Sequence, residues 1–482
     1  MVFNGPMADA QADRIKELEA ALAERDRRIA ELEAALADRD RRLAELERLV
    51  EELRRGGKRQ AAPFSKGKPK PDPKRPGRKP GKAYGRQAVR PVPKKIDERI
   101  KVACPQRCDR EGCCGRVLPL GSASQYQVDL PPVVPRVTEF IVGYGACERC
   151  HKTVQGRHPR QISDALGVGA VHFGPGVIAW AAVLKTVGGV SFEKTATLLA
   201  EMLGMKVNRS TLCRALKRLG RKAEPTYQGL IENIRASPVV YPDETGWKVG
   251  GHSAWLWAFT NKIDTVYAIE QGRGYAEAAK VLGKDFAGVL GADGWAPYRR
   301  FAKATLQTCL AHLLRRSSEM LETATRGAVR FPRAVATVLK TALKLRDRRN
   351  QGTISPHGVA VATGRLAARM ERLLSARFTH PGNRRFAAHL KRYQDAQFVF
   401  LKHAGVEATN WPAEQAIRPA VINRKTSAGN RSFSGARTLA VLMSVVRTCR
   451  HKGLQVAQVL TDMLRNPTPH PHQHVLAPSE NR

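Results

Sequence analysis

The first 55 residues repeat in units of seven, and this repeat leaves them few structures to adopt. The block LEAALAERDRRIAE at 18–31 returns almost unchanged as LEAALADRDRRLAE at 32–45. Apolar residues recur every three or four positions through six heptads, which predicts an α-helical coiled coil over 12–55. One seam position holds Ile15, Leu22, Ile29, Leu36, Leu43 and Val50, and the other holds Leu18, Leu32, Leu46 and Leu53.

Two arginines interrupt the apolar seam of this repeat. Arg25 and Arg39 fall at seam positions, where a charged side chain restricts the register in which helices pair. We therefore expect a homo-oligomer held together through the coiled coil. The alternative is a single amphipathic helix packed on the protein's own body, which Gly56-Gly57 and the flexible segment behind them disfavour.

The segment that follows is cationic and rich in proline. Residues 56–95 contain 14 Lys or Arg, 8 Pro and one acidic residue, Asp72, so 56–100 is predicted to be an extended linker. The net charge of the whole chain is +39, and most of the excess lies outside this linker. A nucleic acid is the partner that this excess indicates, because Lys and Arg neutralise its phosphates. The alternatives are a soluble surface of high pI and a polybasic membrane-surface patch.

The distribution of apolar residues argues against a membrane protein. The most apolar run, 171–184, is shorter than the roughly 20 residues that a bilayer span needs, and the N-terminus lacks the apolar core of a signal peptide. We expect a cytoplasmic, nucleoid-associated protein with no membrane partner. In that compartment the nine cysteines are expected to be thiols or metal ligands rather than disulfides.

Residues 101–160 contain two groups of cysteines about 30 residues apart. The second group is a CxxC pair, and two thiols from the first group would complete a tetrahedral zinc site. The alternative is a set of buried free thiols. The predicted zinc ligands are Cys104, Cys114, Cys147 and Cys150, with Cys108 or Cys113 as alternates.

Residues 161–236 are predicted to be helical and to include a helix-turn-helix. The segment 191–203 has helical apolar spacing, Gly204 follows it, and Asn208 or Ser210 can cap a second helix at 208–222. The exposed face of that second helix would suit a DNA groove or backbone. Helix pairs of this kind also occur in ordinary helical domains. The candidate DNA-binding residues are Arg209, Arg214, Lys217 and Arg218.

From residue 238 the pattern changes to four short strands, with a helix near 275–283 before the last of them. Asp243 falls at the end of the first strand and Asp293 at the end of the fourth, and each is followed closely by Gly-Trp. Two aspartates at neighbouring strand ends can hold divalent cations through oxygen ligands. An isolated aspartate after a strand more commonly forms a turn or caps a helix.

Several separated blocks resemble the insertion sequence 66 type of DDE transposase. They are YPDETGWKVGGHSAWLWAFT, LGADGWAPYRRF with QTCLAHLLRR, and NWPAEQAIRPAVINRKTSAGNRSFSG, and the coiled coil, linker and cysteines stand in that family's order. The resemblance implies an α/β ribonuclease H-like core over 237–448 with a largely helical insertion at about 315–405. It also implies that Asp243, Asp293 and Glu414 form an acidic triad that holds Mg²⁺ or Mn²⁺.

The same resemblance implies an enzyme that cuts and joins DNA by two-metal phosphoryl transfer. Its partners would be the transposon ends, the target DNA and accessory proteins of the same element. Arg418, Arg424 and Lys425 would face phosphates, and 449–482 would be a helix with a disordered tail. His312 would lie behind the metal ligands or contact DNA, and the alternative is a purely structural histidine. The alternatives are a coiled-coil DNA-binding regulator that does not cut DNA and a ribonuclease H-like junction nuclease.

Overall fold

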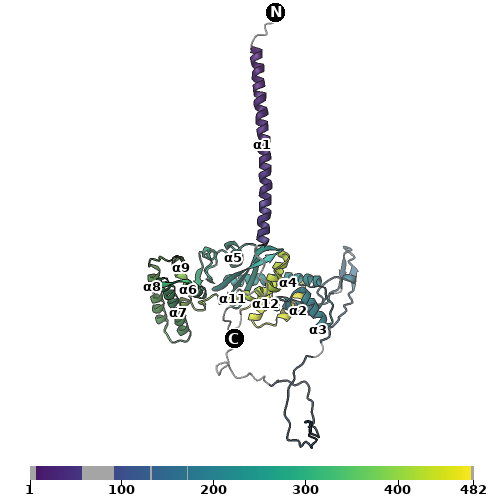
Figure 1. The fold of residues 1–482 in the computed structure, drawn as a ribbon. Helices are drawn as coiled ribbons and strands as arrows, with labels where there is room; N and C mark the ends of the chain where they lie inside the picture. The colour runs from purple at the N-terminus through teal and green to yellow at the C-terminus, as the bar shows by residue number, and fades with distance from the viewer. Residues whose placement is uncertain (1–6, 57–91, 131–132, 171, 479–482) are drawn as a thin grey trace.

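A computed structural model describes residues 7–56, 92–130, 133–170 and 172–478 of the chain. Its first element is one continuous helix, α1 (Met7–Gly56), which extends away from the rest of the protein (Figure 1). The apolar seam is open to solvent along this helix: Leu22, Leu32 and Leu46 are 55%, 60% and 60% exposed. Most of the predicted linker, 57–91, lies outside the described residues.

The cysteine segment has little regular structure. Its strands β1 (Tyr144–Ala146) and β2 (Thr153–Gln155) form a two-stranded antiparallel ladder in which Gly145 is paired with Val154. The 3-10 turn η2 (Gly167–Ala170) follows. Apolar side chains before the ladder are open to solvent, with Val137 and Ile141 each 93% exposed. This segment therefore has no large apolar core among its described residues.

Three helices follow, and local sequence explains their boundaries. They are α2 (Pro175–Thr186), α3 (Phe192–Leu203) and α4 (Arg209–Ala236). Ser191 caps α3 by accepting from Lys194 N–H, and Asn208 caps α4 by accepting from Ser210 N–H. Gly204 ends α3 with φ of +64°, a left-handed conformation that glycine adopts at low cost.

A five-stranded mixed sheet in the order β5-β4-β3-β6-β7 forms the centre of the C-terminal part. Strands β3 (Val239–Val249), β4 (His252–Thr260) and β5 (Thr265–Glu270) are antiparallel, and the Gly250-Gly251 turn joins the first two. Helix α5 (Tyr275–Leu282) leads to β6 (Val289–Ala292), the 3-10 turn η3 (Ala296–Arg300) and β7 (Thr305–Thr308). Both β6 and β7 run parallel to β3. The sheet has one strand more than the four predicted, because the short sequence TLQT of β7 lacks a strong apolar pattern.

Helices cover both faces of this sheet. Helices α11 (Trp411–Ser427) and α12 (Phe433–His451) pack on the face that carries Trp247 and Leu256. The apolar sides of α4 and α5 pack on the opposite face around Trp257 and Phe259, which have no exposed surface. The sheet is therefore buried on both faces, and the helices on these faces hold its strands in position.

The stretch between β7 and α11 is a helical insertion with its own apolar core. It contains α6 (Leu310–Thr323), η4 (Arg326–Val329), α7 (Arg330–Asn350), α8 (Pro356–Leu374), α9 (Pro381–Arg392), η5 (Gln394–Ala396) and α10 (Val399–Lys402). Val338, Leu339, Phe386 and Phe400 are fully buried within it. The insertion lies at one end of the sheet, with α8 at its outer side (Figure 1).

The C-terminal segment packs on the protein, although its Pro/His-rich composition predicts a disordered tail. After α13 (Val456–Arg465), the chain forms the short helix α14 (Gln473–Leu476), and Val475 is fully buried. His472 N–H donates to Thr226 Oγ1 at 2.9 Å. Lys452 donates to the Val475 and Ala477 carbonyl oxygens. One buried apolar side chain with paired backbone groups thus fixes a segment that composition marks as disordered.

Among the described residues, no helix combines the length and the apolar character needed to cross a membrane.

Candidate active site

Strand register brings Asp243 and Asp293 to the same level of the sheet. The parallel strands β3 and β6 pair Val239 with Val289 and Val240 with Leu290, and each aspartate lies four residues beyond the first pair. Asp293 directly follows β6, whereas Asp243 lies inside β3 rather than at its end. The reason is that β3 continues along β4 as far as Val249 after its pairing with β6 has stopped.

A buried asparagine fixes the start of the helix that carries Glu414. Asn410 precedes α11, and its Nδ2 donates to the Pro242 carbonyl oxygen at 2.9 Å. Its backbone N–H donates to Cys309 Sγ at 3.1 Å, directly beyond β7. The first turn of α11, which contains Glu414, is therefore attached to the residue before Asp243.

The carboxylates affect one another electrostatically. Burial raises the pKa of Asp243 to about 7, and the charge of Glu244 is the next cause. Asp293 and Glu414 raise it further, while the Glu244 N–H that Asp243 accepts at 2.9 Å lowers it. A half-buried group of negative charges of this kind is stabilised by a cation.

The donor chemistry at these positions suits Mg²⁺ or Mn²⁺, since every side chain offers carboxylate oxygens. Within the described part of the chain, however, no three His, Cys, Asp or Glu side chains are grouped closely enough to hold a metal ion. The structure brings Asp243, Asp293 and Glu414 into electrostatic contact but does not arrange them as a closed coordination shell.

Glu244 is a fourth carboxylate close to Asp243 and Asp293, and it is not among the site residues predicted from the sequence. Its side chain is only 3% exposed and accepts from Arg273 at 2.7 Å and from the Tyr298 hydroxyl at 2.9 Å. The Arg273 guanidinium lies between Trp255 and Trp295, at 4.6 and 4.4 Å from the ring centroids. Donors of the protein itself thus occupy the Glu244 carboxylate. The feature of the sequence that could have identified Glu244 is its position directly after Asp243.

His312 lies on α6, close to the carboxylate edge. A hydrogen bond with Cys309 raises the pKa of His312, and the charge of Asp293 contributes to the same effect. Burial opposes deprotonation of Cys309, but hydrogen bonds from His312 and the Asn410 N–H lower its pKa overall. The His312 imidazole therefore lies beside the Cys309 thiol, which also accepts from the Asn410 N–H, and close enough to Asp293 to interact with its charge.

The predicted DNA-contacting residues fall into two groups. On α4, Arg209, Arg214 and Arg218 are exposed and Lys217 is half-buried, and Arg209 is 3.4 Å from Glu193. On α11, Arg418 and Lys425 are exposed. Arg424 instead donates to Thr245 Oγ1 at 2.9 Å and to the Gly246 carbonyl oxygen, so it attaches α11 to β3.

The cysteine segment contains two separate pairs of neighbouring thiols, Cys108 with Cys113 and Cys147 with Cys150, and no three of its described cysteines are grouped closely enough to hold a metal ion. Hydrogen bonds from the Gly115 backbone and from Cys108 lower the pKa of Cys113, while the Cys150 and Arg149 backbones and the Cys150 side chain lower that of Cys147. Cys104 and Cys114 are exposed. Lowered thiol pKa values favour the thiolate form that metals bind.

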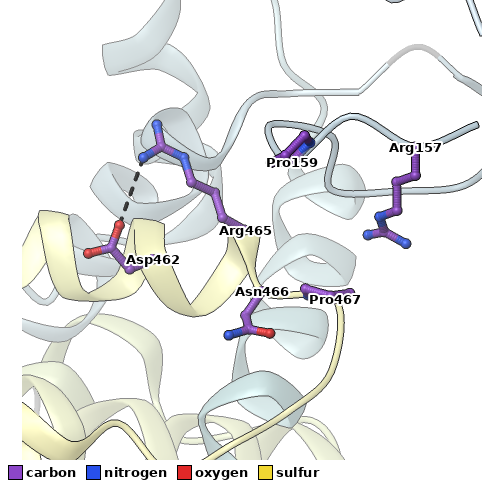
Figure 2. Close-up of a pocket in the computed structure, with 6 residues that line it drawn as sticks. All are labelled: Arg157, Pro159, Asp462, Arg465, Asn466 and Pro467. Carbon is purple, nitrogen blue, oxygen red and sulfur yellow. Dashed lines mark ion pairs between the residues drawn. The ribbon is translucent and has the colours of Figure 1, made fainter.

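A pocket of about 450 Å³ lies between the chain after β2 and the end of α13, distant from the carboxylates in sequence. Arg157 is paired with Asp164 at 2.5 Å, and Arg465 is 3.8 Å from Asp462. Figure 2 shows that these two arginines point apart rather than toward a common point. The pocket thus lacks the converging polar groups of a ligand site. Its lining comprises Arg157, Pro159, Asp462, Arg465, Asn466 and Pro467.

Comparison with known proteins identifies relatives of the region that contains this site. The family described as "Transposase IS66 family" matches residues 170–438, which include β3, β6 and the start of α11. Two uncharacterized proteins of Sinorhizobium fredii (strain NBRC 101917 / NGR234) are also similar. The protein y4qI is 24% identical over 317 residues, or 60% of this chain and 58% of its own length. The protein y4jD is 24% identical over 388 residues, or 73% of each chain.

Proposed function

The chain belongs to the IS66 family of transposases, and from this premise we propose that it binds the terminal inverted repeats of an insertion sequence and catalyses metal-dependent DNA cleavage and strand transfer. The observation that carries the proposal is the shared strand level of Asp243 and Asp293, with the Glu414 helix attached to β3 through Asn410. These contacts support a site near the ends of the paired part of β3 and β6, to which three acidic residues separated by up to 171 positions in sequence would contribute.

We propose that the sheet is a ribonuclease H-like core. Three antiparallel strands followed by two strands parallel to the first, with helices on both faces, support this interpretation. Fold alone does not decide function, because one fold can serve several reactions. Support for the proposed activity comes instead from the acidic residues Asp243, Asp293 and Glu414.

In the proposed reaction, Asp243, Asp293 and Glu414 bind the divalent ions. Two such ions, if held by these carboxylates, would supply the positive charge that activates the attacking oxygen and stabilises the leaving oxygen of an in-line phosphoryl transfer. Arg424 keeps α11 on β3, and His312 supports the Cys309 thiol that accepts from Asn410. Arg418 and Lys425, exposed on α11, contact DNA phosphates beside the site.

The remaining parts of the chain are proposed to hold DNA and to assemble the complex. Helices α3 and α4 bind the terminal repeats through the basic face of α4, and α1 pairs with a second copy of the chain through its exposed seam. Accessory proteins of the same element are further proposed partners, and the protein is proposed to act on DNA in the nucleoid.

Zinc is the proposed structural metal of the cysteine segment. Cys147 and Cys150 supply one pair of ligands. The proximity of Cys108 and Cys113 favours these two thiols as the other pair over Cys104 and Cys114. Binding of one zinc ion by all four thiolates would require the two pairs to come together, because no three of the described cysteines are grouped closely enough to hold a metal ion.

The test is cleavage of a DNA duplex that carries the element's ends by the full-length protein. We expect nicking at the end in Mg²⁺, joining of the released 3′-hydroxyl to a second duplex, and neither reaction for Asp293→Asn. Cleavage without joining would indicate a junction nuclease. Binding without cleavage by the wild-type protein would indicate a DNA-binding regulator. Either result would overturn the proposed function.

A further inference from the structure

The turn after Asp293 is in contact with the helical insertion. Gly294 has φ of +90°, and a Cβ at this position would lie 3.4 Å from His389 Cε1. The His389 ring in turn packs on Tyr393, with 5.0 Å between ring centroids. Helix α9 therefore contacts Gly294, the residue directly after Asp293, and lies beside that carboxylate.

Arginines from three elements surround this contact. The Arg299 guanidinium of η3 lies 5.8 Å from the Tyr393 ring, and that of Arg316 on α6 lies 4.9 Å from the Phe386 ring. Arg392 ends α9. Burial is the main cause of the lowered pKa of His389, and the charges of Arg316 and Arg392 add to it. Three guanidinium groups thus lie on the Asp293 side of the insertion.

The charge of Glu319 acts on Arg316, but the charges of Arg299 and Arg392 are not offset by a carboxylate as that of Arg273 is. Arg273 is paired with Glu244 at 2.7 Å. By contrast, Arg299 and Arg392 are exposed, and within the described residues neither forms an ion pair with a carboxylate. Arginines kept in place beside a catalytic carboxylate, with no acidic partner, are suited to bind the anionic groups of a ligand.

Resting on the proposed function, we propose that Arg299, Arg316 and Arg392 form a phosphate-binding wall that holds the DNA backbone beside Asp293. The helical insertion is then part of the active site rather than a separate scaffold. DNA that passes the carboxylates requires counter-charge, and the wall supplies it from η3 and the insertion, in addition to the proposed phosphate contacts of α11. Guanidinium groups match phosphate oxygens in both charge and geometry.

The experiment measures binding of an end-bearing DNA duplex by full-length protein in Ca²⁺ across a series of KCl concentrations. For R299Q/R392Q, we expect the slope of log Kd against log [KCl] to fall by about 2, since each phosphate contact contributes about 0.9. Cleavage in Mg²⁺ should fall at least about tenfold at 0.15 M KCl. R299K/R392K retains the charges and should restore most of the slope.

The matched control is R365Q/R369Q, which removes two exposed charges from α8 of the same insertion. Both variants must first melt at the wild-type temperature. An unchanged salt slope in R299Q/R392Q, or an equal decrease of the slope in R365Q/R369Q, would then overturn the proposed phosphate-binding wall. If the proposed function is wrong but the wall exists, the wild-type protein cuts no DNA, and R299Q/R392Q still lowers the salt slope of DNA binding.

Discussion

The cysteine segment and the sheet hold their reactive side chains in different ways. Around the sheet, Leu256 and Trp257 are fully buried, and Asn410 attaches the Glu414 helix to β3. In the cysteine segment, Val137 and Ile141 are almost fully exposed, and the strands are three residues long. Packing places the carboxylates before any metal binds, whereas the thiols have little besides a metal to hold them. The two metals that we propose therefore have different consequences when removed.

The largest effect is expected from zinc removal. A chelator, or the C147S/C150S variant, should unfold residues 101–160, because structural zinc supplies on the order of 10 kcal/mol of folding free energy to small modules. Limited proteolysis should then cut this segment, while the melting temperature of the sheet changes by less than about 3 °C. C213S, at an isolated cysteine on α4, is the control. Melting of the sheet together with the segment would contradict the comparison.

The next largest effect is expected at Asp243. Asp243→Asn should lower DNA cleavage at least about 1,000-fold, equivalent to about 4 kcal/mol of transition-state stabilisation, because a proposed metal ligand is lost. Binding of the DNA end should change little, since binding depends on basic residues elsewhere. Asp285→Asn, at an exposed aspartate paired with Lys303 at 2.8 Å, is the matched control and should cleave normally. Loss of DNA binding in Asp243→Asn would show a structural role instead.

A third effect concerns the pH dependence of stability without metal. Burial raises the pKa of Asp243 to about 7, so the protonated carboxyl fits the folded state better than the charged one. The stability that this provides is complete below the unfolded pKa near 4 and is lost as pH rises through about 7. At pH 8, metal-free Asp243→Asn should therefore be about 2 to 4 kcal/mol more stable than the wild type, and the difference should vanish near pH 4. Urea unfolding at both pH values measures this, and a difference that is independent of pH would contradict it.

The smallest effect is expected at Asn410. Asn410→Ala removes the buried bond to the Pro242 carbonyl oxygen, at a cost of about 1 to 3 kcal/mol of stability. Cleavage should also fall roughly tenfold, because Glu414 is no longer held beside Asp243. Asn383→Ala, which removes a similar 3.0 Å bond to Ala328 within the insertion, should cost comparable stability. Equal losses of cleavage in both variants would show that the Asn410 bond has no special role at the site.

Sequence patterns predicted the local features of the molecule. The heptad spacing predicted a helix at the N-terminus, Gly204 and Asn208 marked helix boundaries, and the predicted position after a strand is confirmed for Asp293 but not for Asp243, which lies inside β3. These features depend on periodicity and capping, which neighbouring residues determine.

Features that depend on distant contacts were less accessible. Glu414 was found only through family resemblance, because its position depends on a bond between Asn410 and Pro242, 168 residues apart. The contact of His389 with Gly294 and the pairing of Glu244 with Arg273 leave no periodic signal. The docked tail was predicted to be disordered because composition does not show that Val475 has an apolar site to fill.

The most direct test of the central claim, that the sheet edge and α11 together bind the catalytic metal, is a change of metal preference at Glu414. A thiolate is a softer ligand than a carboxylate and is poorly suited to Mg²⁺. Full-length Glu414→Cys is assayed for cleavage of the DNA end in Mg²⁺ and in Mn²⁺. The account predicts almost no cleavage in Mg²⁺ and substantial recovery in Mn²⁺. Cleavage at the wild-type rate in Mg²⁺ would contradict it.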